Sequence, residues 1–154
     1  MIEVRAEPAS GPVGRRLLGE MVSHLAGLYG EISLDRTPSA TPEDMGPPGG
    51  TFLVIYEDGE PVACGGVKRL GPGLGEIKRM YVVPGARRRG HARRMLVALE
   101  DAARELRHER VRLDTGELQP EARALYESSG YHPIPDYNQN AYAAFWFEKD
   151  LTAP

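Results

Sequence analysis

The chain has 154 residues, of which 41% are hydrophobic and 27% are charged. This is the composition of an ordinary globular protein, so we expect one domain that spans residues 1–154. The net charge of −3 argues against a protein that binds nucleic acid or an anionic membrane surface, because both functions need a basic surface. The single cysteine cannot form an internal disulfide, and no apolar run reaches the roughly 18 residues of a membrane span, so we expect a cytoplasmic protein without a signal peptide.

The beginning of the chain predicts a short strand followed by a long helix. Residues 2–5 alternate apolar and polar side chains, which is typical of a strand. Gly11-Pro12 then begins a helix, because proline is favoured in the first helical turn, and an apolar stripe continues to about Gly30. His24 lies off that stripe, and we expect it to face solvent.

The next part of the chain predicts an irregular loop and a hairpin. Residues 31–50 show no periodicity, apart from a capped turn at Thr41-Pro42-Glu43-Asp44. This segment is either a substrate loop or a plain connector, and the sequence leaves both open. Residues 51–56 and 61–69 are apolar strands joined by Asp58-Gly59, a strong hairpin signal.

The central segment predicts a strand, a basic turn and an amphipathic helix. Residues 76–83 are rich in β-branched and aromatic side chains and stop at Pro84-Gly85. A basic turn at residues 86–91 leads into a helix with an apolar stripe over residues 92–106. The first N–H groups of a helix have no internal partners, and the helix dipole is positive there, so this turn predicts a site for a phosphate group.

Three further elements complete the predicted fold. Residues 110–115 predict a strand, Gln119-Pro120 begins a short helix that ends by Gly130, and residues 143–151 predict a last strand. The predicted order is therefore β-α-β-β-β-α-β-α-β, an α/β arrangement.

Two motifs in these elements resemble those of the GCN5-related N-acetyltransferase (GNAT) superfamily. Arg87-Arg88-Arg89-Gly90-His91-Ala92 fits the Gln/Arg-x-x-Gly-x-Gly/Ala pattern that closes the coenzyme A site in that family. Gln119-x-x-Ala122-x-x-Leu125-Tyr126 followed by Gly130-Tyr131 is similar to the family segment Asn-x-x-Ala-x-x-Leu-Tyr-x-x-x-Gly-Phe. The resemblance implies the GNAT fold, a strongly twisted mixed sheet of about six to seven strands with helices on both faces.

The resemblance also implies acetyl-CoA as cosubstrate and a binding site for it. The backbone of the fourth strand would pair with the pantetheine arm, and the N–H groups of the basic turn would hold the diphosphate. His91 occupies a free position of the motif and is expected to have no chemical role. The implied cofactor-binding residues are Met80, Tyr81, Val82, Arg87, Arg88, Arg89, Gly90, His91, Ala92, Arg93 and Gln119. No metal is implied, since the four histidines show no ligand spacing.

The resemblance implies two catalytic residues. Glu76 lies eleven positions before Arg87, the spacing of the glutamate base in histone acetyltransferases of the superfamily. It would act directly or through water; the alternative is a strand-end carboxylate paired with Lys78 or Arg79. Tyr126 would protonate the leaving thiolate, and its alternative is a core tyrosine.

The function implied is transfer of an acetyl group to the primary amine of a small molecule, by direct attack in a ternary complex. The alternatives are a protein or peptide N-acetyltransferase and a coenzyme A-binding sensor domain without catalysis. A homodimer is left open, and Cys64 is expected to be a small core residue. Residues of the two variable loops could hold an ammonium group: Glu43, Asp44, Asp136, Asn138 and Asn140.

Overall fold

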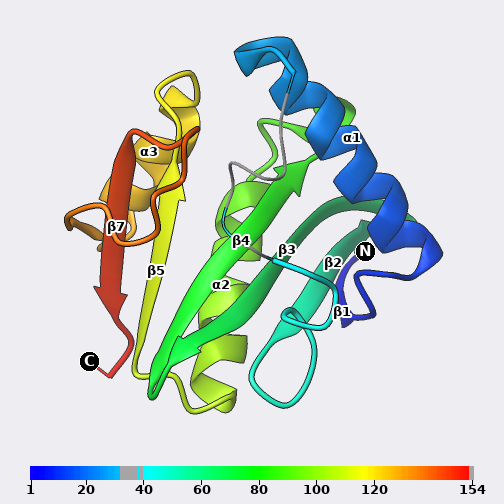
Figure 1. The fold of residues 1–154 in the computed structure, drawn as a ribbon. Coiled ribbons are helices and arrows are strands. Elements are labelled where there is room, and N and C mark those ends of the chain that lie inside the picture. Colours follow the sequence, from blue (N-terminus) through cyan, green and yellow to red (C-terminus); the bar gives the residue numbers. More distant parts are fainter. Residues whose placement is uncertain (32–37, 39, 153–154) are drawn as a thin grey trace.

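The computed structural model describes residues 1–31, 38 and 40–152, and in this part of the chain seven strands form one mixed sheet (Figure 1). The strands are β1 (Ile2–Ala6), β2 (Thr51–Glu57), β3 (Glu60–Gly71), β4 (Leu74–Val82), β5 (Arg110–Thr115), β6 (His132–Pro133) and β7 (Phe145–Asp150). Their order across the sheet is β1-β2-β3-β4-β5-β7-β6, and β4 and β5 pair in parallel while the other neighbours are antiparallel. The predicted fold class is confirmed, and the short strand β6 is an addition to it.

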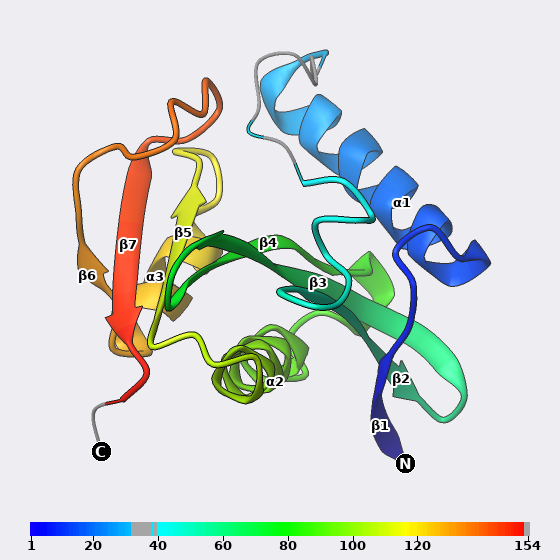
Figure 2. The ribbon, with the colours of Figure 1, turned by 60° about the horizontal axis from the view of Figure 1, so that its bottom comes forward.

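Helices cover both faces of the sheet (Figure 2). The helix α1 (Pro12–Tyr29) packs on one face, and α2 (His91–Glu105) and α3 (Pro120–Ser128) lie on the other; a short 3-10 helix, η2 (Pro84–Ala86), connects β4 to α2. The sheet therefore separates two apolar cores. One includes Leu17 of α1, and the other includes Leu96 and Leu99 of α2.

The local signals in the sequence account for the turns. Asp58 and Gly59 have φ values of 52° and 86°, the left-handed conformation that a two-residue hairpin turn requires. Thr41 Oγ1 accepts a hydrogen bond from the Asp44 N–H at 3.1 Å, and Asp44 Oδ2 accepts one from the Thr41 N–H at 3.0 Å, so the predicted capped turn forms. Residues 32–37 and 39 of the predicted loop lie outside the described residues.

The strands β4 and β5 part soon after they meet. They pair only at Leu74, Gly75 and Glu76, opposite residues 110–112, whereas β5 pairs along its whole length with β7. Figure 1 shows the two strands diverging from the lower end of the sheet. Glu76 is therefore the last paired residue of β4 on this side, and an opening begins above it.

A β-bulge in β4 lies at the same opening. In the register of β3 with β4, Cys64 pairs with Tyr81 and Gly66 pairs with Lys78. The single residue Gly65 of β3 is therefore opposed by two residues of β4, Arg79 and Met80. Arg79 takes a left-handed backbone conformation with φ of 61°. The extra residue reverses the side-chain alternation, so that Met80 packs on the α2 core and Tyr81 joins the α1 core.

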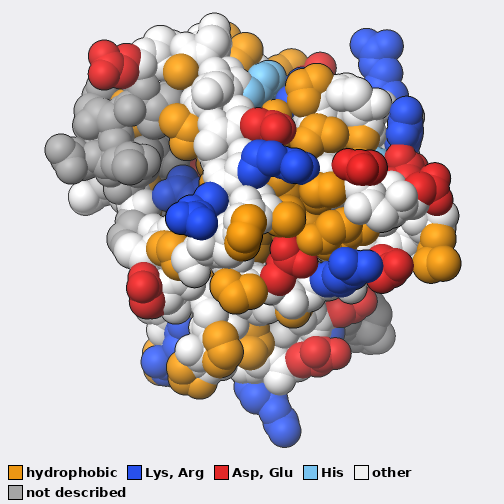
Figure 3. All heavy atoms as spheres, turned by 90° about the vertical axis from the view of Figure 1, so that its right-hand side faces the viewer, with side chains coloured by type: hydrophobic (Ala, Val, Ile, Leu, Met, Phe, Trp, Pro, Cys, Tyr) orange, Lys and Arg blue, Asp and Glu red, His pale blue; other side chains and the backbone are white. Residues whose placement is uncertain are grey.

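The surface carries charges of both signs. Figure 3 shows basic and acidic side chains interspersed on the side of the molecule that is on the right in Figure 1. None of the helices in the described ranges combines the length and apolar character that a membrane span requires.

Candidate functional site

The opening between β4 and β5 is a cavity of about 1100 Å³. Its walls come from α1, β4, the start of α2, the end of β5, α3 and residues 140–143. The cavity lies where the two parallel strands separate, and it connects the first turn of α2 to the polar end of β5.

The first turn of α2 presents free backbone N–H groups to this cavity. The first helical hydrogen bond runs from the Arg94 N–H to the Gly90 carbonyl at 3.0 Å, so the N–H groups of His91, Ala92 and Arg93 have no acceptor within the helix. Gly90 caps the helix with φ of 81°, and Arg88 two residues earlier has φ of 65°. A Cβ on Gly90 would meet nothing closer than 3.7 Å, so backbone conformation, rather than space, requires glycine there.

The predicted arginines differ in where their side chains lie. Arg87 and Arg88 line the cavity, and Arg87 Nε donates to the Val82 carbonyl at 3.0 Å. Arg93 also lines it and donates to the hydroxyls of two serines that end α3. Arg89, by contrast, is absent from the cavity wall and donates to Glu57 at 2.6 Å. The structure therefore does not direct the Arg89 guanidinium into the cavity.

His91 is buried at the start of α2, although the sequence assigned it no chemical role. Arg94 Nη1 lies 3.3 Å from Nδ1 of His91, and a guanidinium can only donate, so Nδ1 is the acceptor. Nε2 is 3.5 Å from Glu57 and makes no hydrogen bond. Glu57 also binds Arg89, so this residue at the end of β2 contacts the side chains of the residues directly before and after Gly90.

The free edge of β4 forms a second wall of the cavity. Met80, Tyr81 and Val82 line it, as the predicted pantetheine strand requires. Tyr81 and Val82 pair with β3 on one edge, while the edge that faces β5 has no strand beside it after Glu76. Such an edge can pair with an extended ligand that carries amide groups.

Tyr126 and Gln119 reach the cavity from α3. Gln119 caps the helix and lines the cavity. The Tyr126 side chain is 6% exposed, and its hydroxyl has one weak partner, the Met80 sulfur at 3.8 Å. Burial, and to a lesser degree the charge of Asp114, raises the pKa of Tyr126, so the hydroxyl keeps its proton at neutral pH.

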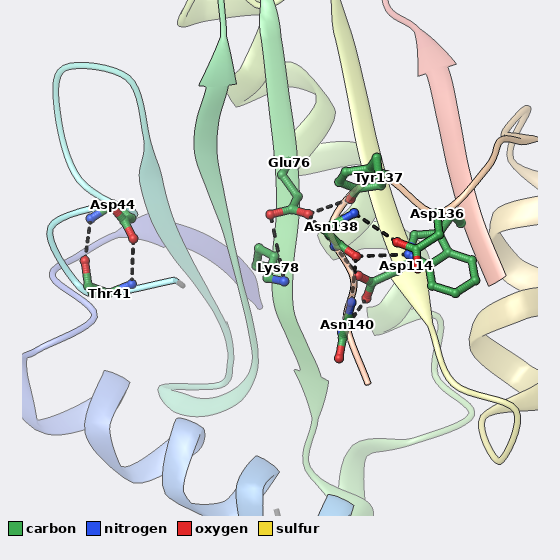
Figure 4. A network of polar contacts seen from close by, with 10 residues as sticks. Thr41, Asp44, Glu76, Lys78, Asp114, Asp136, Tyr137, Asn138 and Asn140 are labelled. Atoms are coloured by element: carbon green, nitrogen blue, oxygen red, sulfur yellow. Dashed lines mark hydrogen bonds and ion pairs between the residues drawn. The ribbon is translucent and has the colours of Figure 1, made fainter. Parts of the chain in front are cut away.

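Glu76 is buried beneath the cavity rather than in its wall. Its side chain is 1% exposed, and one carboxylate oxygen accepts hydrogen bonds from the Tyr137 hydroxyl at 2.5 Å and from Asn138 Nδ2 at 3.1 Å (Figure 4). The other oxygen makes no hydrogen bond and lies 3.8 Å from Lys78 Nζ. Burial, followed by the charge of Glu76, raises the pKa of Tyr137. The structure thus favours the alternative in which Glu76 pairs with Lys78 over direct contact with an acceptor.

Two carboxylates line the cavity: Asp114, half-buried at the end of β5, and Glu121, exposed in the first turn of α3. The sequence did not point to Asp114. Its two oxygens accept hydrogen bonds from Asn138 Nδ2 at 2.6 Å and from Asn140 Nδ2 at 3.3 Å. Trp146 Nε1 donates to Asn138 Oδ1 at 3.0 Å and so orients that amide. The available signal was an acidic residue one position before the end of a predicted strand.

The remaining predicted polar residues divide between the cavity and the surface. Asn140 lines the cavity, whereas Asp136 accepts backbone hydrogen bonds of its own loop and Glu43 is exposed. His24 is half-buried, lines the cavity and lies 6.2 Å from the Tyr81 ring between centroids, so it belongs to the cavity wall although it lies off the apolar stripe of α1. Within the described part of the chain, no cluster of three or more His, Cys, Asp or Glu residues could hold a metal ion.

Known proteins share this fold and sequence pattern. The sequence model of the acetyltransferase (GNAT) family matches residues 13–131. The chain is 34% identical over 143 residues to a protein named IAA acetyltransferase from Azospirillum brasilense, covering 88% of this chain and 89% of that one. A solved structure described as an acyl-CoA N-acyltransferase from Klebsiella pneumoniae has a TM-score of 0.77 and 25% identity over 98% of both chains. An N-acetyltransferase from Thermoplasma acidophilum in complex with coenzyme A has a TM-score of 0.72 at 14% identity, covering 97% of this chain and 99% of that one.

Proposed function

The chain belongs to the acetyltransferase (GNAT) family and is an N-acetyltransferase, and we propose that it transfers an acetyl group from acetyl-CoA to the primary amine of a small molecule. The observation that carries the proposal is the cavity at the β4–β5 opening, which joins the free N–H groups of α2 to Tyr126 and Asp114. We also propose that residues 1–154 form one domain that works in the cytoplasm, and that the amine attacks in a ternary complex.

The residues around the cavity fit coenzyme A. The N–H groups of residues 91–93, with Arg87 and Arg88 beside them, suit a diphosphate. The free edge of β4 suits the amide-rich pantetheine arm. With the arm lying along β4, the thioester would lie near Met80 and therefore near the Tyr126 hydroxyl.

Acetyl transfer requires movement of two protons. An alkylammonium with a pKa near 10 is neutral for only about one molecule in a thousand at pH 7, so a group must take its proton before or as the nitrogen attacks the thioester carbonyl. The new C–N bond forms, the C–S bond breaks, and the thiolate that leaves must be protonated. We assign protonation of the thiolate to Tyr126, whose buried hydroxyl remains protonated.

We assign contact with the amine, and acceptance of its proton, to Asp114. Of the two carboxylates in the cavity wall, Asp114 is half-buried and close enough to Tyr126 to act on its hydroxyl, whereas Glu121 is exposed. Glu76, the base expected from the sequence, acts in our proposal through Asn138, whose Nδ2 binds both carboxylates. Glu76 thus positions the group that contacts the acceptor, and a water between Asp114 and the amine would be compatible with this arrangement.

Two alternatives have less support. A sensor domain needs coenzyme A binding alone, and it gives no role to the Asp114 carboxylate that two amides hold at the cavity. A protein or peptide acceptor would need an open path for its backbone. Residues of α1 form part of the cavity wall and narrow such a path. A homodimer remains open and is tested by the sedimentation of the purified chain.

The experiment is incubation with acetyl-CoA and a panel of amines, with IAA tested beside them because it stands in the name of a relative, while free thiol is measured. We expect thiol release with one class of small amine and a matching N-acetyl product by mass spectrometry. If coenzyme A binds tightly and no small amine causes thiol release, but a peptide added as acceptor becomes acetylated, the result would favour the peptide alternative.

A further inference from the structure

Arg79 is an unusual residue in the wall of the cavity. It is the left-handed residue of the β4 bulge, a backbone conformation that is strained for a residue other than glycine. The residue lines the cavity. The strand therefore holds a guanidinium at the opening at some cost in backbone energy.

The Arg79 guanidinium has no anion of its own. Among the residues that the structure describes, it forms no ion pair and donates no hydrogen bond, although it is half-buried. Burial lowers its pKa, and the nearby charges of Asp114 and Glu76 offset this only in part. Both carboxylates are instead bound by amide and hydroxyl groups of residues 137–140. A partly desolvated cation without a partner is a site for an anion from outside the chain.

The place of Arg79 in the strand assigns that anion to the acceptor rather than to coenzyme A. Its neighbour Met80 contacts the Tyr126 hydroxyl, where the thioester reacts in our proposal. The strand continues for three residues beyond Arg79, or about 10 Å, before the turn that leads to the diphosphate site. Arg79 therefore lies at the reacting end of the cavity.

We propose that the acceptor is an amino acid, whose carboxylate binds Arg79 while its amino group lies at Asp114. This rests on the proposed function and specifies its substrate class. A planar guanidinium can bind a carboxylate through two parallel hydrogen bonds, and Asp114 supplies the opposite charge for the ammonium. The two side chains come from the two strands that part, so a small zwitterion would lie across the opening between them.

The test compares L-amino acids with their carboxamides as acceptors, with acetyl-CoA as donor. Loss of the carboxylate charge lowers the pKa of the neighbouring ammonium, so a larger fraction of the carboxamide is free amine at neutral pH. A preference for the free acid is then attributed to binding of its carboxylate. We expect the best amino acid to exceed its carboxamide by about tenfold or more in kcat/KM. Equal use of both compounds, or preference for the carboxamide, overturns the inference.

Two variants locate the preference. In Arg79→Gln we expect kcat/KM for the free acid to fall roughly 10- to 100-fold, mainly through KM, while the rate with the carboxamide is kept. Arg79→Lys should keep part of the preference. The matched control is Arg15→Gln, which removes the same charge from an exposed position of α1 outside the cavity and should change neither rate. An equal loss with both acceptors, or a loss of coenzyme A affinity with the preference intact, overturns the assignment to Arg79.

Different results with the acceptors distinguish loss of the amino-acid specificity from loss of acetyl transfer itself. Thiol release with simple amines but not with amino acids overturns the inference alone. No release with any amine, although calorimetry shows coenzyme A binding, overturns the proposed function and the inference with it. Should Arg79→Gln fail to fold, the comparison of free acid and carboxamide in the unaltered chain decides the question.

Discussion

Glu76 and Asp114, from two strands that have just separated, share one amide group: Nδ2 of Asn138 lies 3.1 Å from the first carboxylate and 2.6 Å from the second. One of these carboxylates is buried and the other faces the cavity. The buried one therefore influences the acceptor through the position of Asn138 rather than by contact.

Removing the charge of Asp114 should reduce acetyl transfer while coenzyme A binding is kept. We expect Asp114→Asn to lower kcat/KM by roughly 10- to 100-fold, the effect of losing a charged hydrogen bond. Steady-state kinetics and calorimetry with coenzyme A measure the two effects. Asp101→Asn, on the exposed face of α2, is the control. Unchanged kinetics in Asp114→Asn would show that a residue other than Asp114 contacts the amine.

Removing the Tyr126 hydroxyl should reduce turnover more than it reduces affinity. We expect Tyr126→Phe to lower kcat by roughly 100- to 10,000-fold, the usual contribution of a general acid. Stability should change little, because the hydroxyl has only the weak contact with Met80. Kinetics and thermal unfolding measure these quantities. If coenzyme A affinity falls in parallel with kcat, the tyrosine has a structural role.

Replacing Gly90 should weaken coenzyme A binding through the backbone. The φ of 81° is strained for alanine by about 1–2 kcal/mol, and relief of that strain would turn the N–H groups of α2 away from the cavity. We expect about tenfold weaker binding of coenzyme A in Gly90→Ala, measured by calorimetry. Gly85→Ala is the matched control, since its φ is not positive and a Cβ there meets no atom within 4 Å. Equal affinities in the two variants would contradict the role of the first turn of α2.

The protein should lose stability at alkaline pH. Burial raises the pKa of Tyr126, Tyr131 and Tyr137 in the folded chain, so above about pH 10 the unfolded chain loses protons that the folded chain keeps. Their contribution is fully present below the unfolded pKa and decreases as pH rises, by about 1.4 kcal/mol per pH unit for each tyrosine. Urea unfolding between pH 8 and pH 11 measures how the free energy of unfolding changes with pH. Tyr137→Phe should reduce that slope by the contribution of one tyrosine. A flat profile would contradict the burial of these hydroxyls.

Cys64 should not react with thiol reagents in the folded protein. Its side chain is fully buried in β3, and burial raises the pKa of the thiol to about 12, so the thiolate is scarce at neutral pH. We expect no reaction with an aromatic disulfide at pH 8 until urea unfolds the chain, after which one thiol per chain reacts. Rapid reaction of the folded protein would make Cys64 a candidate nucleophile, and would also add to the thiol-release signal.

The sequence predicted the elements whose signals are local. The hairpin at Asp58-Gly59 and the turn at Arg88 and Gly90 depend on residues within a few positions, and both form where expected. The wall around the acceptor depends on contacts between distant residues. Asn138 meets Glu76 across 62 positions, and no periodicity in the sequence reports such a contact.

The bulge at Arg79 was hidden for a related reason. The segment over residues 76–83 reads as an unbroken strand, because the extra residue is visible only in the register with β3. The bulge moves Tyr81 beside His24, so a histidine that seemed to belong to the outer face of α1 lies in the cavity wall.

The three-residue pairing of β4 with β5 has a consequence for the whole molecule. The sheet consists of two parts, β1 to β4 and β5 to β7, that are joined only by this short pairing. The end of α1 also connects them, because the Tyr29 hydroxyl accepts a hydrogen bond from the Leu118 N–H at 3.0 Å. A pantetheine arm that lies along the free edge of β4 would add hydrogen bonds between the two parts of the sheet. Binding of coenzyme A to the folded chain would therefore raise the free energy of unfolding. At a ligand concentration a hundred times the dissociation constant, this binding contributes about 2.7 kcal/mol, a sizeable share of the stability of a domain this small.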